Sequence, residues 1–210
     1  EEPKLGNSNF DKKIKKTEVS VEKNKNDIKS EFIHLHNHSQ YSVLQATSSI
    51  EKIVSKSIEY KMNAVAITDL GNMFGVFKFN RIAQKNNIKP IIGCEFYIAP
   101  KNRFDKDPSY SYDHLTVIAK NNLGYSNLIK LVSRGNLEGF YYRPRIDKEI
   151  LKEHSEGLIV LSGCPSAELF KKIGSLDQNQ RKEYASKLNS LKEKDLHESF
   201  KTFGFSEELR

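Results

Sequence analysis

The sequence predicts an α/β fold, and three observations support this prediction. From Phe32 onward, short apolar runs alternate with longer stretches in which apolar residues recur every three or four positions. The short runs are typical of buried strands, and the longer stretches are typical of helices that pack on a sheet. The chain has 210 residues and 37% hydrophobic content, which is enough for one well-packed domain. The expected architecture is therefore a sheet covered by helices.

The first predicted elements follow a segment of different composition. Residues 1–30 are rich in Lys, Asn, Glu and Ser and contain few large apolar residues, so they predict a disordered tail. Residues 32–36 are expected to form the first strand. A helix is expected at 49–61, where apolar residues recur at helical spacing and Ser48 or Ser49 can cap the first turn.

The middle of the chain continues the alternation of strand and helix. A short apolar run predicts a strand at 64–69, and helical spacing predicts a helix at 75–87. The run Ile-Ile-Gly-Cys-Glu-Phe-Tyr-Ile predicts a longer strand at 89–98. Polar residues predict a loop at 99–113, and the next apolar run predicts a strand at 114–120. These elements are the centre of the predicted sheet.

The last part of the pattern contains more helix than strand. Helices are expected at 123–137 and at 146–154, the second of them marked at its start by Pro144. A strand is expected at 157–164, and a further helix is expected at 165–173. This order completes the predicted α/β series.

The chain is expected to divide into three parts. The disordered, charged tail takes residues 1–30, and the α/β domain takes residues 31–175. Residues 176–210 form a charged C-terminal segment, in which a helix is expected at 178–196. We interpret the start at Glu1 and the end of the pattern as signs of a truncated or split product.

Composition excludes some classes of protein and leaves others open. The net charge of +7 is compatible with a nucleic-acid partner, although a solvated, mildly basic surface is the favoured explanation. Cys94 and Cys164 lie far apart and form no CxxC motif, so neither a disulfide framework nor a zinc knuckle is indicated. The chain has no apolar run of about 18 residues, the length that spans a bilayer. We therefore expect a cytoplasmic protein without a membrane partner.

Three histidines near the start of the predicted domain are candidate metal ligands. His34, His36 and His38 alternate along the first predicted strand, so they are expected to share one face. Ile33 and Leu35 are expected on the opposite, apolar face. Two imidazoles on one face can bind zinc, manganese or iron. A hydrogen-bonded strand face without metal explains an isolated His-x-His pattern about as well.

Further candidate ligands stand near the ends of later predicted strands, namely Asp69, Glu95, His114 and Cys164. In a parallel α/β barrel, groups from different strands converge at one rim, so residues far apart in sequence can form one site. Such a metal site activates water for attack on phosphorus, which makes phosphoester hydrolysis the indicated reaction. Each residue also has a structural explanation. Asp69 fits a helix cap, and Glu95 fits a pair with a lysine. His114 fits a hydrogen-bonded edge histidine, and Cys164 fits a small buried thiol.

Five sequence blocks between Phe32 and Phe170 indicate a family: FIHLHNHSQYSVLQ, NAVAITDLGNMFGVFKF, IKPIIGCEFYIA, HLTVIAKNNLGYSNLIKLVSRGNLEGFYYRPRID and GLIVLSGCPSAEL. In this order they resemble the N-terminal polymerase-and-histidinol-phosphatase (PHP) domain of bacterial replicative DNA polymerase III alpha subunits. The fourth block is the most specific, because its HLT and EGFYY-x-PRID patterns belong to the polymerase branch rather than to PHP phosphatases in general.

The resemblance implies a fold and a metal site. The implied fold is a distorted (β/α)7 barrel, of which this chain carries a part. The implied cofactor is a divalent metal, zinc or manganese, which supports a 3′ to 5′ exonuclease in some members. The residues that match the family's ligands by position are His36, His38, Asp69, Glu95, His114 and Cys164.

Three departures from the family pattern weaken the implied metal site. Leu70 stands where metal-competent relatives have the histidine of a TDHGN motif, and leucine does not bind metal. Gln45 stands where an acidic residue is often found. The Asp-x-His pair of a late strand is missing, since the only histidine after Cys164, His197, has a different context. Metal binding is therefore expected to be weak or lost.

The leading functional hypothesis follows from the resemblance. The chain is similar to a segment of a DNA-directed DNA polymerase that acts in DNA replication, as a structural and interaction module. The implied partners are DNA, other replicative polymerase subunits and the remaining polymerase domains. The chain contains no palm segment with paired aspartates, so it is not expected to polymerise DNA alone, and magnesium is expected to serve the full-length polymerase.

Two other functions remain open at this stage. An active metal-dependent phosphoesterase or 3′ to 5′ proofreading exonuclease is favoured by the five ligand positions other than Cys164. A simple DNA-binding module would use basic side chains such as Arg134, Arg143 and Arg145, and its binding would fall steeply with salt.

Overall fold

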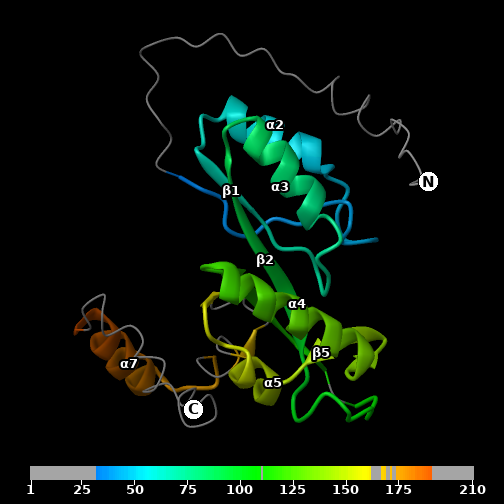
Figure 1. Cartoon of the computed structure of the whole chain (residues 1–210). Coiled ribbons are helices and arrows are strands. Elements are labelled where there is room, and N and C mark those ends of the chain that lie inside the picture. The colour runs from blue at the N-terminus through cyan, green and yellow to red at the C-terminus, as the bar shows by residue number, and fades with distance from the viewer. Residues whose placement is uncertain (1–31, 110, 162–166, 169–170, 172–173, 191–210) are drawn as a thin grey trace. The chain divides into compact units, whose positions relative to one another are not determined.

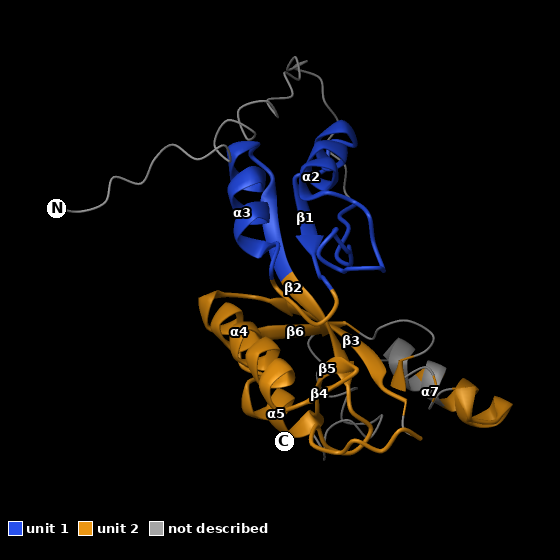
Figure 2. Cartoon of the chain, turned by 90° about the vertical axis from the view of Figure 1, so that its right-hand side faces the viewer, with its two compact units in different colours: residues 1–69, 74–92 blue, residues 70–73, 93–210 orange. Residues whose placement is uncertain are grey.

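The computed structural model describes residues 32–109, 111–161, 167–168, 171 and 174–190 (Figure 1). The predicted tail, Cys164, most of the helix predicted at 165–173 and the end of the last predicted helix lie outside these residues. The chain divides into two compact units (Figure 2). Unit 1 contains the residues up to Asp69 and Phe74–Ile92, and unit 2 contains Leu70–Met73 and the residues from Gly93 onward.

The described residues of unit 1 form two helices and a pair of parallel strands. Helix α2 spans Ile50–Glu59 and helix α3 spans Val76–Lys85. Strand β1, Ala64–Ile67, pairs in parallel with the first four residues of strand β2, which spans Lys89–Ile98. Helix α2 packs against both α3 and β1, and the core between them contains fully buried aliphatic and aromatic side chains.

Local sequence explains where the elements of unit 1 begin. Ser49 caps helix α2, since its hydroxyl accepts a hydrogen bond from the backbone N–H of Lys52 at 3.3 Å. The cap confirms the predicted start of this helix. Ile50 and Val54 lie four positions apart and are both buried, as the helical period requires. Lys78 of α3 forms a 2.6 Å ion pair with Glu51 of α2, which links the two helices at their surface.

The strand predicted at residues 32–36 is wrong. The segment forms two backbone hydrogen bonds beside β1, from Ala66 N–H to the His34 carbonyl at 2.9 Å and from Thr68 N–H to the Asn37 carbonyl at 2.8 Å. These bonds do not make a continuous ladder. Leu35 is also exposed rather than packed on an apolar face, since 42% of its surface is accessible. Alternation of residue types alone therefore overstated the backbone pairing of this segment.

Unit 2 contains a mixed sheet whose strands lie in the order β4-β5-β2-β3-β6. The strands that join β2 in this unit are β3 (Asp113–Ala119), β4 (Phe140–Tyr141), β5 (Arg143–Ile146) and β6 (Leu158–Leu161). Strand β2 runs parallel to β5 but antiparallel to β3, and β6 is antiparallel to β3. The parallel arrangement expected from barrel geometry is thus replaced here by a mixed one.

Three helices of unit 2 are described, namely α4 (Asn122–Leu137), α5 (Lys148–Glu153) and α7 (Gln178–Ser190). The prediction of one helix at 146–154 is wrong at its start. Ile146 belongs to β5, and Asp147 caps α5 by accepting a hydrogen bond from Ile150 N–H at 3.1 Å. Pro144, interpreted as a helix start, lies in a β-strand next to the short strand β4.

The sheet of unit 2 has two chemically different faces. Helix α4 packs against β3, β5 and β6. A Cβ atom added to Gly135 of α4 would lie 3.1 Å from the Ile146 side chain, so Ile146 faces this helix. Ile98 of β2 pairs with Ile146, so alternate residues of β2 face α4 too. Glu95 and Tyr97 occupy the intervening positions and face away from it.

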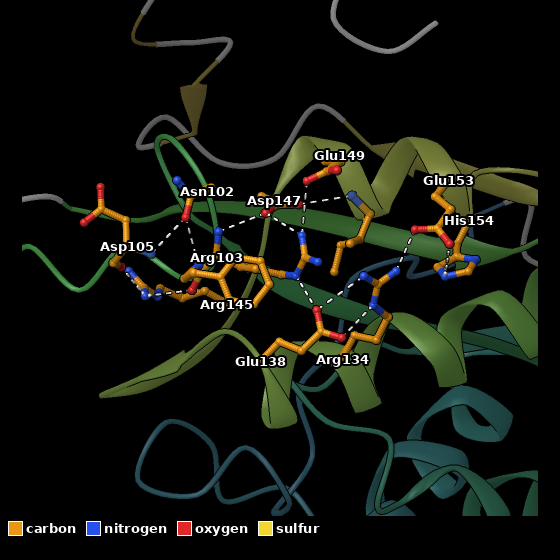
Figure 3. Close-up of polar contacts among 12 residues, drawn as sticks. Asn102, Arg103, Asp105, Arg134, Glu138, Arg145, Asp147, Glu149, Glu153 and His154 are labelled. Atoms are coloured by element: carbon orange, nitrogen blue, oxygen red, sulfur yellow. Dashed lines mark hydrogen bonds and ion pairs between the residues drawn. The ribbon is translucent and has the colours of Figure 1, made fainter.

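A network of ion pairs attaches the loop after β2 to the helices of unit 2 (Figure 3). Arg103 donates hydrogen bonds to Asp147 at 2.9 Å and to Glu138 at 2.5 Å. Arg134 in turn contacts Glu138 at 3.0 Å and Glu153 at 2.6 Å. Arg103 and Asp147 are almost fully buried, so each needs the other's charge to remain there.

Candidate metal centre

His36 and His38 bring their imidazole nitrogens together within unit 1. Their Nε2 atoms lie 3.2 Å apart, and their ring centroids lie 5.0 Å apart. Two nitrogens bound to one tetrahedral zinc ion at 2.0–2.1 Å would be about 3.3 Å apart. The pair therefore fits a shared metal ion, and it equally fits a direct hydrogen bond between one protonated and one unprotonated nitrogen. His34 is separate from this pair, and its ring lies 4.8 Å from that of Phe32.

Asp69 lies at the end of β1, and hydrogen bonds from one loop already occupy its carboxylate. Ser39 donates twice, from its N–H at 2.6 Å and from its hydroxyl at 2.7 Å, and the Ser42 hydroxyl donates at 2.6 Å. All three residues are buried. The carboxylate thus anchors the loop that follows His38, and the three hydrogen bonds take three of its roughly four acceptor sites.

Leu70 and Gln45, the two departures from the expected ligand pattern, are both placed by backbone pairing. Leu70 forms an isolated parallel bridge with Glu95, and the next residue, Gly71, donates its N–H to the Glu95 carbonyl at 2.8 Å. Leu70 therefore continues the backbone pairing of β2. Gln45 is exposed in the turn after Ser42, where its N–H donates to the Ser42 carbonyl at 2.9 Å.

Glu95 and His114 form a hydrogen-bonded pair within unit 2. Their Oε1 and Nδ1 atoms lie 2.7 Å apart, and Glu95 is buried whereas His114 is partly exposed. This bond fixes the orientation of the imidazole and leaves Nε2 for a metal or a proton. The ring of Tyr97 packs edge-on against His114 at 5.0 Å, and Tyr112 packs beside both. The aromatic rings hold His114 in place.

Tyr97 is a further polar group beside this pair. Burial raises the pKa of its phenol, and the nearby positive charge of Arg143 opposes that effect. Tyr97 is therefore a neutral hydroxyl at neutral pH, which can donate a hydrogen bond. Sequence reasoning had placed Tyr97 within a strand without giving it a role.

The predicted ligands thus fall into two sets, one in each unit. His36, His38 and Asp69 belong to unit 1, and Glu95 and His114 belong to unit 2. His36, His38 and Glu95 carry ligand atoms of the kinds that hold a divalent metal ion. Cys164 lies outside the described residues. Cys94 is buried within β2, as expected of a structural cysteine.

Residues 34–198 match the family described as the PHP domain. The chain belongs to the PHP domain family. The match includes both units and all six predicted ligands, and it covers more than half of the 210 residues. The blocks around the histidines therefore identified the family correctly.

Curated relatives of this PHP domain are named DNA polymerase III subunit alpha. The protein of Chlamydia muridarum is 52% identical over 141 residues, which cover 66% of this chain and 11% of the relative. The protein of Treponema pallidum is 43% identical over 163 residues, which cover 76% of this chain and 14% of the relative. The PHP domain described here therefore spans only a small part of the length of these relatives.

Among solved structures, an amidohydrolase from Chromobacterium violaceum has a TM-score of 0.37 and 16% sequence identity, over 48% of this chain and 32% of that chain. No helix among the described residues of the PHP domain is both long and apolar enough to cross a membrane.

Sequence reasoning did not find the groups that surround the predicted ligands of the PHP domain. Ser39 and Ser42 donate hydrogen bonds to Asp69 from 30 and 27 positions away, respectively. The Ser-x-x-Ser spacing after His38 is the signal that was available, because it puts two hydroxyls in one turn. Arg143 was considered only as one of several basic residues, although its guanidinium carbon lies 5.9 Å from the Tyr97 ring centroid.

Proposed function

We propose that this PHP domain is the N-terminal part of a replicative DNA polymerase III alpha subunit and acts in DNA replication as a structural and interaction module. The observation that carries the proposal is the 52% identity to a protein named DNA polymerase III subunit alpha over 66% of the chain. The proposed partners are DNA, other replicative subunits and the remaining polymerase domains, in the cytoplasm. Polymerisation, with its magnesium ions, belongs in this proposal to the remaining domains.

The proposed architecture is part of a distorted (β/α)7 barrel over residues 31–175, with a disordered tail at 1–30 and a charged helical segment at 176–210. The mixed α/β sheet with helices on it supports the coarser description. Strand β6 ends the described strand order, and Ile159 and Val160 in it remain partly exposed. Further strands beside β6 would cover these side chains in a closed barrel.

We further propose that the residues matching the family ligands serve a weakened site for zinc or manganese. The residues are His36, His38, Asp69, Glu95, His114 and Cys164. The spacing of the two Nε2 atoms in unit 1 fits such an ion, and the donor set of imidazoles and carboxylates suits it. Two observations support weakness: serine hydrogen bonds take three of the roughly four acceptor sites of Asp69, and Leu70 supplies no ligand. A bound metal would supply an activated water.

A second candidate function is a metal-dependent phosphoesterase or 3′ to 5′ proofreading exonuclease. The pair formed by Glu95 and His114 favours it, because a carboxylate that orients an imidazole is a common feature of metal sites and of general-base sites. Under this alternative the Nε2 atom of His114 would bind a metal ion or carry a proton, and Tyr97 would donate a hydrogen bond beside it. The two functions differ in how tightly metal binds.

Metal analysis and a nuclease assay separate the two functions. The 210-residue chain is expected to retain less than one metal ion per molecule after dialysis and to release little or no nucleotide from a 3′-labelled strand. The double variant His36→Ala/His38→Ala is expected to lose the remaining metal, whereas His34→Ala serves as the matched control and keeps it. Stoichiometric metal, with nuclease activity that the double variant abolishes, would establish the phosphoesterase and overturn the weakened site.

A gain-of-ligand variant tests the cause of the weakness. Leu70→His restores an imidazole at the position where the family has one, and it is expected to raise metal affinity at least several-fold. Unchanged affinity would show that Asp69 or the other missing ligands limit binding instead.

A further inference from the structure

The β4–β5 hairpin of unit 2 exposes a group of aromatic side chains. It consists of strands β4 and β5 with Tyr142 between them. The accessible fraction is 54% for Phe140 and 78% for Tyr142. The rings of Tyr141 and Tyr142 lie 4.6 Å apart in an edge-to-face arrangement, so they form one small surface. Contiguous exposed aromatic residues of this kind mark a surface that binds a partner.

The backbone of Tyr142 adopts a conformation that a bulky residue rarely takes. Its φ angle is +56°, in the left-handed region where glycine or asparagine is usual. Leu44 and Lys61 also have a positive φ, so this conformation alone does not mark a binding site. At Tyr142 it places an exposed aromatic ring between the two strands of the hairpin.

The arginines of unit 2 differ in whether their charge is already used. Arg103 and Arg134 pair with carboxylates. Arg145 is buried and donates to the carbonyl oxygens of Gly139 at 3.1 Å and Asp105 at 2.6 Å. Two of the three arginines first considered for DNA binding, Arg134 and Arg145, therefore hold the fold together.

Arg143 is different from these arginines. Within the part of the chain that the structure describes, no carboxylate forms an ion pair with it, and its contact is with the Tyr97 ring. It is partly exposed. A guanidinium within cation–π range of an aromatic ring is attracted to the ring, and it is more weakly hydrated than an ammonium, so it is well suited to bind a phosphate oxygen.

Strand register places Arg143 on the same face of the sheet as the Glu95–His114 pair. Arg145 pairs with Tyr97 across β5 and β2, and Arg143 lies two positions before Arg145. Residues two apart in a strand share a face, so Arg143, Tyr97 and Glu95 lie on one face. His114 pairs with Tyr97 across β2 and β3 and joins them there. An anion bound by Arg143 would lie on this face.

We propose that the β4–β5 hairpin binds single-stranded DNA, with Arg143 on a phosphate and the ring of Tyr142 stacked on a base. The choice of DNA rests on the proposed function in replication, whereas the chemistry rests on the hairpin. An exposed aromatic ring stacks only on a base that is not already stacked between its neighbours. A single strand offers such bases, and a duplex does not. The hairpin is short, since β4 has two residues and Tyr142 lies between the strands. It is therefore expected to contact one phosphate and one base.

Fluorescence anisotropy with a labelled single-stranded oligothymidine tests the proposal. The 210-residue chain is used with a chelator present, so that neither metal binding nor hydrolysis affects the result. Arg143→Ala is expected to weaken binding about tenfold and to reduce the slope of log affinity against log salt by about 0.7, the value for one phosphate contact on a single strand. Lys130→Ala removes an exposed charge from helix α4 and is the matched control.

A second variant keeps the test independent of misfolding. Tyr142→Gly removes the ring and relieves the positive φ, so the melting temperature is expected to stay level or rise while binding weakens about tenfold. A duplex of the same sequence is expected to bind more weakly and to be insensitive to this change.

Three results would overturn the proposal: equal effects of Arg143→Ala and Lys130→Ala, an unchanged salt slope for Arg143→Ala, or equal sensitivity of duplex and single strand to Tyr142→Gly. Failure here would leave the metal measurements on His36 and His38 unaffected, so it is distinguishable from failure of the proposed function.

Discussion

Asp69 matches a metal ligand by position, yet its carboxylate already accepts three hydrogen bonds from Ser39 and Ser42. Each of these donors is buried and would be left without its charged acceptor if Asp69 were removed. Hydrogen bonds to a buried charged group contribute more to stability than neutral ones, and an orphaned buried donor is costly. At this residue the structural role is directly visible, whereas metal binding remains a proposal.

Replacing Asp69 measures that structural role. Asp69→Ala is expected to lower the free energy of unfolding by about 3 kcal/mol, because it leaves the Ser39 and Ser42 donors unsatisfied. Urea denaturation followed by circular dichroism measures the change. The matched control is Glu59→Gln, which breaks an exposed pair with Lys56 and is expected to change stability by less than about 0.5 kcal/mol. A loss below about 1 kcal/mol for Asp69→Ala would show that the loop does not depend on this carboxylate.

Single residues also show what a sequence cannot reveal. The proximity of His36 and His38 could be expected from their spacing of two, and their Nε2 atoms do lie 3.2 Å apart. The partners of Asp69 and Arg103 could not be expected, since Asp147 is 44 positions from Arg103 and no local pattern links them. Contacts of that kind depend on how the chain folds back on itself.

Elements were predictable where local pattern and tertiary pairing agree. Strand β2 has the predicted bounds, Lys89–Ile98, and α2 begins at the predicted serine cap. The β4–β5 hairpin was missed because its residues are aromatic and basic rather than alternating apolar and polar. Its strands are defined by pairing with each other and with β2, a contact that local periodicity does not contain.

The start of helix α4 depends on a close approach between two glycines. A Cβ atom on Gly124 would lie 1.8 Å from the carbonyl oxygen of Gly157, which itself has a φ of +74°. Gly124→Ala is therefore expected to push α4 away from the turn before β6 and to cost about 3 kcal/mol of unfolding free energy. Thermal and urea denaturation both measure this loss.

Gly174 provides the control for that substitution. A Cβ atom there would meet nothing within 4 Å, so Gly174→Ala is expected to change the unfolding free energy by less than about 0.5 kcal/mol. Equal effects of the two alanine variants would refute the steric explanation for Gly124.

At the scale of the whole chain, the charge balance makes acid the sensitive condition. The chain has 34 Lys and Arg against 27 Asp and Glu, so protonating carboxylates adds to an existing positive charge. In unit 2 acid also removes specific ion pairs, because Arg103 and Arg134 pair with Glu138 and Glu153. Uncompensated arginines then repel one another.

The direction of the pH dependence follows from these carboxylates. Hydrogen bonds from Arg134 and then from Arg103 lower the pKa of Glu138 below 4.5, and Arg134 lowers the pKa of Glu153 in the same way. A carboxyl group whose pKa is lower in the folded state contributes stability above its unfolded-state pKa, near 4.5 here. That contribution is lost as the pH falls through the lower, folded-state value. We therefore expect the chain to be destabilised progressively below about pH 4.5.

The variant Glu138→Gln tests this origin of acid sensitivity. It keeps the size of the side chain but removes the titrating group, so it is expected to be less stable than the wild type at pH 7 and to lose less stability on acidification. Unfolding free energies from urea titrations between pH 7 and about pH 3 measure both effects. Glu156→Gln, at an exposed position before β6, is the control and is expected to follow the wild-type curve. If Glu138→Gln retained the full wild-type pH dependence, the acid response would have to originate outside this network, in the general accumulation of positive charge.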